Sequence, residues 1–172
     1  CLAMLVGATF AWFTDTASTG VNKIQAGNLD VALEYSTDME NWKEATSSTK
    51  LFSDNTLWEP GVTEVVYLRV KNNGNLALKY TMGLNSQVGF ANGVNKAGDT
   101  YNVGDYLKLG TATVTGKLAT REEAWAAVAG TAHVMADLKP FTDGMPVLKA
   151  GETSDAMALV IYMPTEVGNE AN

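Results

Sequence analysis

Residues 64–84 read EVVYLRVKNNGNLALKYTMGL, and this stretch decides which fold the sequence predicts. In its first half, Val66, Leu68 and Val70 recur at every second position, which is the period of a β-strand with one buried face. The central Asn73-Gly74 pair consists of residue types that adopt the positive φ angles of a tight turn. The following residues alternate again, so the stretch predicts a β-hairpin. Its return strand has apolar residues at Leu76, Leu78, Tyr80, Met82 and Leu84.

Three other segments show the same two-residue period. They are residues 29–35, 106–114 and 157–163, and each places large apolar side chains at alternate positions. The Pro60-Gly61 pair predicts a turn that leads into the strand at residues 64–71. Polar loops separate the strands, and Trp42 is the bulkiest side chain in the longest of these loops.

One segment departs from the strand pattern. Thr120 and Glu123 have the spacing of a helical capping box, and the residues after them are mostly good helix formers. Trp125 and Val128 lie three positions apart, so both can face a sheet from one side of the helix. The sequence therefore predicts an all-β protein with one short helix, built as a two-sheet antiparallel β-sandwich.

Composition excludes several classes of function. The 172 residues are enough for one domain with its own core, and the formal net charge is −7. An acidic chain without a basic stretch is not expected to bind nucleic acid or to dock electrostatically on anionic lipid. One histidine and one cysteine exclude most zinc sites and any disulfide within the chain.

The N-terminal residues 1–13 are uncharged and apolar, but too few to span a bilayer. They have the character of the hydrophobic region of a signal peptide, and small residues at Thr9 and Ala11 favour cleavage between Ala11 and Trp12. Residues 1–11 are then the end of a signal peptide, and residues 12–172 form a single β-sandwich domain. Two alternatives stay open, a buried N-terminal strand and a lipidated N-terminus at Cys1.

Several segments, in this order, are similar to those of one protein family. They are Gly7-Ala8-Thr9-Phe10-Ala11-Trp12-Phe13-Thr14-Asp15, Ala26-Gly27-Asn28-Leu29-Asp30-Val31, Leu57-Trp58-Glu59-Pro60-Gly61, residues 70–80 and residues 162–170. The chain thereby resembles the family of secreted proteins that includes the biofilm fibre protein TasA and camelysin. Members carry a distinctive signal peptide that a dedicated signal peptidase removes.

The resemblance implies a jelly-roll-like sandwich, secretion to the extracellular matrix or cell surface, and assembly into filaments. The implied partners are other copies of the chain, other matrix or cell-surface proteins, and the signal peptidase during secretion. Family members usually continue into one more strand, so the resemblance also implies that the domain lacks its last strand.

Catalytic chemistry finds little support among the residues. Camelysin is described as a metallo-endopeptidase, but such an enzyme needs two His ligands, a third ligand and a Glu base, and His133 stands alone. A lone histidine after a helix is expected to be a capping or surface residue. No Gly-x-Ser-x-Gly motif for a serine nucleophile is present.

Carboxylates offer weaker candidates. Asp30 with Glu34 is expected on a solvated strand face, and Glu122 with Glu123 at the start of the helix. A loop calcium site at Asp38, Glu40 and Asn41 has suitable oxygen ligands but lacks EF-hand spacing. The sequence therefore predicts no catalytic, metal or cofactor-binding residue, and a protein that is not an enzyme.

The predicted function is that of a secreted filament subunit that assembles by strand addition. The donor segment is expected at residues 12–20, with Trp12, Phe13, Thr14 and Asp15 in the subunit contact, because its polar residues have little power to form a core. Alternatives are a camelysin-like metallo-endopeptidase and a monomeric surface binding module that uses exposed Trp42 and Trp58.

Overall fold

A computed structural model describes residues 28–46, 48–52, 56–83, 92–95, 97–135 and 146–167. The strands are β1 (Val31–Ser36), β2 (Lys43–Glu44), β3 (Thr63–Asn72), β4 (Leu78–Lys79), β5 (Asn92–Val94), β6 (Thr100–Asn102), β7 (Lys108–Val114), β8 (His133–Val134), β9 (Val147–Leu148) and β10 (Ala156–Tyr162). The helical elements are the 3₁₀ turn η1 (Val103–Asp105) and the helix α2 (Arg121–Val128).

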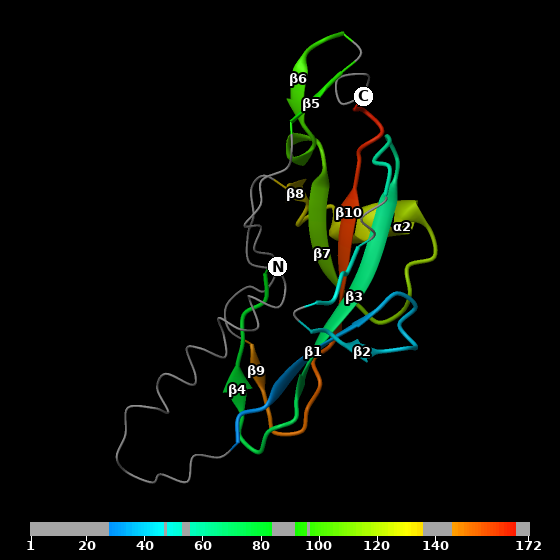
Figure 1. The fold of residues 1–172 in the computed structure, drawn as a ribbon. Coiled ribbons are helices and arrows are strands. Elements are labelled where there is room, and N and C mark those ends of the chain that lie inside the picture. The colour runs from blue at the N-terminus through cyan, green and yellow to red at the C-terminus, as the bar shows by residue number, and fades with distance from the viewer. Residues whose placement is uncertain are drawn as a thin grey trace, which may run out of the picture.

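The strands form one large sheet and two small ribbons. The six-stranded sheet has the order β2-β1-β3-β10-β7-β8, and each pair of neighbours in it is antiparallel. The pairs β4–β9 and β5–β6 lie outside it at opposite ends of the molecule (Figure 1). The prediction of a mostly β, antiparallel protein with one short helix is confirmed.

Alternation along the two central strands explains why both faces of the sheet are buried. In β3, Val66, Leu68 and Val70 point to one face, and Tyr67 to the other. β10, between β3 and β7, alternates in the same way, with Leu159 and Ile161 in one core and Ala158 and Val160 in the other. Two hydrophobic cores result, one on each face.

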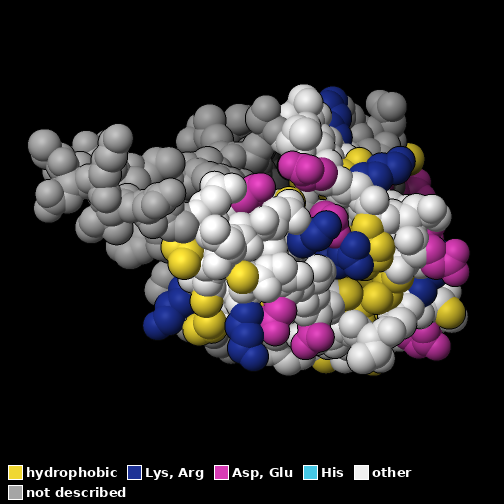
Figure 2. Space-filling model, turned by 90° about the horizontal axis from the view of Figure 1, so that it is seen from below, with side chains coloured by type: hydrophobic (Ala, Val, Ile, Leu, Met, Phe, Trp, Pro, Cys, Tyr) yellow, Lys and Arg dark blue, Asp and Glu magenta, His cyan; other side chains and the backbone are white. Residues whose placement is uncertain are grey.

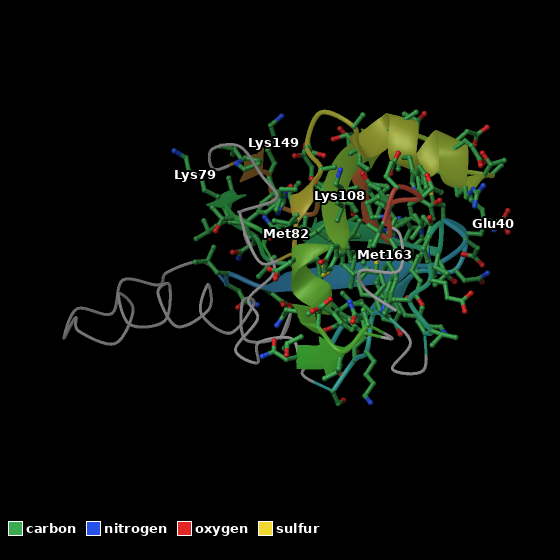
Figure 3. All side chains as sticks on the ribbon, turned by 90° about the horizontal axis from the view of Figure 1, so that it is seen from above. Glu40, Lys79, Met82, Lys108, Lys149 and Met163 are labelled. Atoms are coloured by element: carbon green, nitrogen blue, oxygen red, sulfur yellow. The ribbon has the colours of Figure 1, made fainter. Side chains whose placement is uncertain are left out.

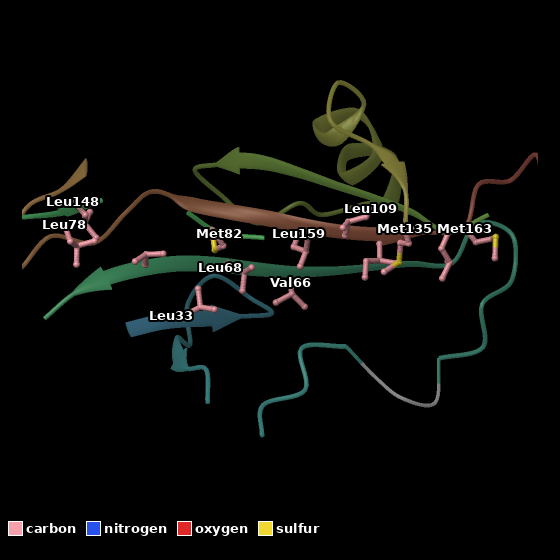
Figure 4. Packing of buried hydrophobic residues seen from close by; sticks show 13 residues of the cluster. Leu33, Val66, Leu68, Leu78, Met82, Leu109, Met135, Leu148, Leu159 and Met163 are labelled. Carbon is pink, nitrogen blue, oxygen red and sulfur yellow. The ribbon is translucent and has the colours of Figure 1, made fainter. Parts of the chain in front are cut away.

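The larger core, here called the ribbon-side core, joins the sheet to the β4–β9 ribbon. Figure 4 shows Leu68, Leu159 and Leu109 on three adjacent strands, with Leu78 and Leu148 supplied by the ribbon. The buried members are Leu33, Val66, Leu68, Val70, Leu78, Met82, Leu107, Leu109, Met135, Leu148, Leu159, Ile161 and Met163.

The smaller core, the helix-side core, lies between the sheet and α2. The helix begins as predicted, because the Thr120 hydroxyl accepts a hydrogen bond from the N–H of Glu123 at 3.2 Å. The Glu123 carboxylate in turn accepts from the N–H of Ala119 at 2.8 Å. Val128 is buried against the sheet, and Trp125 stacks on Tyr162 with ring centroids 4.9 Å apart.

The predicted hairpin at Asn73-Gly74 is wrong. β3 pairs with β1 and β10, whereas the segment after the turn forms β4 and pairs with β9. The N–H groups of Asn73 and Gly74 both donate to the carbonyl of Asp30. A Cβ at Gly74 would lie only 2.2 Å from the carbonyl oxygen of Asn28, so this position needs glycine for close backbone approach and not for a turn.

The side chain of Asn72 fixes the course of the chain from the end of β3 to β4. Its side chain is fully buried, and its amide nitrogen lies 2.7–3.2 Å from the carbonyl oxygens of Leu76, Leu148 and Lys149. Its side-chain oxygen accepts from the N–H of Gly74 at 3.0 Å. One side chain thus ties the end of β3 to β9 and to the segment that leads into β4.

The other predicted strands are present with shifted ends. Residues 29–35 form β1 and residues 157–163 form β10, each displaced by one or two positions. The strand expected from Tyr106 begins at Lys108, because η1 precedes it, although Leu107 and Leu109 are both buried as predicted. The predictions for Ala11, Trp12, Phe13, Thr14 and Asp15 lie outside the described residues.

Candidate functional site

His133, the only histidine, belongs to an edge strand. It pairs with Leu109 across β8 and β7, and its Nδ1 lies 2.9 Å from the carbonyl oxygen of Thr131. Its Nε2 is buried and has no hydrogen-bond partner among the residues that the structure describes. The described part of the chain brings together no cluster of three or more His, Cys, Asp or Glu side chains suited to a metal. The surroundings of this imidazole are therefore those of a packed strand residue.

Replacing His133 by Leu is expected to leave the fold intact and to raise the free energy of unfolding by up to about 1 kcal/mol. A buried polar atom without a partner costs about 1–3 kcal/mol, and the lost bond to Thr131 is exposed and offsets part of that gain. Urea denaturation measures the change. A loss of more than about 2 kcal/mol would show that the imidazole makes an essential interaction.

The acidic loop after β1 is organised by the Asp38 carboxylate. Oδ1 accepts from the Ser36 hydroxyl and from the N–H groups of Glu40 and Asn41, at 2.8–2.9 Å. Oδ2 accepts from the side-chain amide of Asn41 at 2.6 Å. The hydrogen bonds from Asn41 have the largest effect, and together with those from Ser36 and Glu40 they hold the pKa of Asp38 well below its usual range. The contribution of Asp38 to the stability of the loop is therefore fully present above the usual pKa of an aspartate. It is lost as the pH falls through the lowered pKa of Asp38 in the folded protein.

The candidate carboxylates Glu34, Glu122 and Glu123 have structural partners. Glu34 lies opposite Arg69 in the sheet and accepts from its Nε at 2.6 Å. Glu122 accepts from Arg121 at 2.6 Å, and Glu123 caps α2. Asp30, the predicted companion of Glu34, is exposed, and its backbone carbonyl accepts from the N–H groups of Asn73 and Gly74.

The two tryptophans proposed as exposed binding residues are half-buried. The guanidinium carbon of Arg69 lies 4.1 Å from the centroid of the Trp42 ring, and the indole N–H donates to the carbonyl of Met39. Trp42 also packs on the helix-side core, and Trp58 on the ribbon-side core. Both rings therefore stabilise the domain, and the expectation that they are exposed is wrong.

The surface is mixed in charge. On the face shown in Figure 2, basic and acidic side chains are interspersed with small hydrophobic areas. In the view of Figure 3, Lys79 and Lys149 lie toward one side of the molecule and Glu40 lies on the opposite side. Three valine and leucine side chains are largely exposed, Leu57 at 74%, Val94 at 69% and Val147 at 60%. The described helices include none long and apolar enough to cross a membrane.

The edges of the six-stranded sheet are its most distinctive feature, because both outer strands have only two residues. Along β1, β2 pairs with Glu34 and Tyr35, and the N–H of Ala45 donates to the carbonyl of Leu33. In an antiparallel sheet every second residue points its N–H and C=O to the same edge, so Val31 is the next β1 residue on this side. No strand of the described chain pairs with Val31 from this side.

The opposite edge, along β7, is covered for longer. The N–H of Met135 donates to the carbonyl of Leu107, and His133 pairs with Leu109. At the next outward-facing residue, Thr111, the partner is the hydroxyl of Thr131 and not a strand. The two edges of the sheet therefore differ: no strand of the described residues reaches β1 at Val31, whereas several different groups cover β7 from Leu107 to Thr111.

Comparison with known proteins gives no relative: no family model, no curated protein and no solved structure matches this chain. The resemblance to the TasA and camelysin family thus stays a prediction from the sequence.

Proposed function

We propose that this protein is a secreted structural protein, a subunit of filaments in the extracellular matrix or on the cell surface, similar to the TasA and camelysin family. The proposal includes a jelly-roll-like sandwich, to which the β4–β9 ribbon and its shared core with the large sheet lend support. The observation that carries it is the edge of β1 at Val31, which has no strand partner among the described residues.

The proposed assembly reaction is strand addition between copies of the chain. An open edge presents unpaired N–H and C=O groups, and an extended segment from a neighbour satisfies them. Residues 12–20 are the proposed donor, because the segment is too polar to form a core of its own. Its two large apolar residues, Trp12 and Phe13, can instead insert into a neighbouring subunit. Burying one such side chain in a neighbour contributes about 1.5–3 kcal/mol.

The double substitution Trp12→Ser with Phe13→Ser in the full chain is expected to abolish filaments and leave a folded monomer. The reason is that both apolar anchors of the donor are lost while the described domain is untouched. Electron microscopy and sedimentation velocity measure assembly, and circular dichroism checks the fold. Leu57→Ser, which removes a 74% exposed leucine elsewhere, is the matched control and should still assemble. Normal filaments from the double variant would refute the donor assignment.

A further inference from the structure

Thr131 makes an unusual pair of bonds to the edge of β7. Its hydroxyl donates to the carbonyl oxygen of Thr111 at 2.6 Å and accepts from the N–H of the same residue at 3.0 Å. These are the two groups that an added antiparallel strand would engage at Thr111. A single side-chain oxygen therefore occupies the place of a strand.

The end of α2 holds Thr131 in this position. The N–H groups of Thr131 and Ala132 both donate to the carbonyl of Val128, at 2.9 and 2.8 Å. Val128 itself is fully buried on the sheet directly over Gly110. The hydroxyl thus reaches Thr111 from a backbone that is fixed by the packing of the helix.

Without the hydroxyl, this edge has the properties of a pairing surface for a second copy of the chain. Residues 110–114 read GTATV, with β-branched side chains at Thr111, Thr113 and Val114 that favour strands. The segment carries no charge, so two copies can approach in antiparallel orientation without like-charge repulsion. Thr113 faces the same edge as Thr111, because the two lie two positions apart.

We infer that Thr131 is an edge cap that prevents a second copy of the chain from pairing with β7. The cap closes the β7 edge from Leu107 to Thr111 together with β8 and Met135. Of the two edges of the six-stranded sheet, the β1 edge at Val31 is then the one we assign to productive strand addition, and this second statement alone rests on the proposed function.

The test uses Thr131→Val in the full chain, because valine keeps the shape of threonine and removes the hydroxyl. Sedimentation velocity is expected to show self-association with a dissociation constant at least tenfold lower than that of the unchanged protein. Thr131→Ser keeps the hydroxyl and should behave like the unchanged protein. A folded Thr131→Val variant that associates no more than the unchanged protein would overturn the inference.

A second measurement does not depend on whether the variant folds. Amide hydrogen exchange of the unchanged protein should show the Thr111 N–H protected, and exchange at the rate of a free amide would overturn the cap. Each Thr131 variant is also made together with Trp12→Ser and Phe13→Ser. Association of the Thr131→Val variant in that background supports the cap even if the donor assignment fails, so the two proposals are tested separately.

Discussion

Replacing Asn72 by Asp is expected to lower the free energy of unfolding by about 3–5 kcal/mol, which is enough to unfold many domains. The Asn72 side chain is fully buried and directs its amide nitrogen at three carbonyl oxygens. A carboxylate of the same shape would place negative charge against those oxygens and would have no hydrogen atoms to donate to them.

The matched control for this substitution is Asn73→Asp. Asn73 is the next residue in the chain and is exposed, so the same chemical change there should alter the free energy of unfolding by no more than about 0.5 kcal/mol. Urea denaturation followed by circular dichroism compares the two variants. Similar losses in both would show that the buried amide does not hold the ribbon to the sheet.

Adding a single methyl group at Gly110 is expected to disrupt the packing of α2. A Cβ there would lie 2.6 Å from the Cβ of Val128 and 3.3 Å from the Cα of Ala132. These atoms belong to the helix and its continuation, so the helix would have to move away from the sheet. Overpacking of this kind costs about 1–3 kcal/mol, and Gly110→Ala is expected at the upper end of that range.

The signal of this displacement is specific. Trp125 stacks on Tyr162 beneath the helix, so near-ultraviolet circular dichroism should weaken in Gly110→Ala. Gly116→Ala is the control, because no atom of the described residues, its two chain neighbours aside, lies within 4 Å of the position of the new Cβ. A Gly110→Ala variant as stable as Gly116→Ala would contradict the close contact of helix and sheet.

Local features of the sequence predicted most of the secondary structure. The alternation of Val66, Leu68 and Val70 specifies a strand with one face in the ribbon-side core, and the structure has that face buried. The capping box of Thr120 and Glu123 specifies the start of α2 in the same way. Both signals act within a few residues, so they can be recognised without knowledge of the fold.

The partners of the strands could not be predicted in this way. β3 pairs with β10, which lies far along the chain, and β4 pairs with β9 instead of returning along β3. The Asn73-Gly74 pair predicted a hairpin turn, but glycine is also needed where two backbone segments pass close together. At Gly74 the second segment is residues 28–30, whose position cannot be read from the local sequence. The edge cap could not be predicted either, because the hydrogen bond from Thr131 to Thr111 depends on the position of β7 next to this loop.

The candidate chemical residues were predicted correctly only in part. Glu123 caps α2 as expected, whereas Glu34, expected on a solvated face, is paired with Arg69. The bulk of Trp42 was visible in the sequence, but its cover by Arg69 depends on the pairing of β1 with β3. Residue type thus limits which kinds of contact a side chain can make, and the long-range pairing of strands decides which partner it contacts.

Electron microscopy of the full chain, at a resolution that traces the backbone, tests the proposed function most directly. The expected result is a filament in which each subunit receives an extended strand from its neighbour along the open edge of β1, next to Val31. The donated strand is expected to contain Trp12 and Phe13. A chain that stays monomeric, or filaments whose subunits touch without exchanging a strand, would contradict assembly by strand addition.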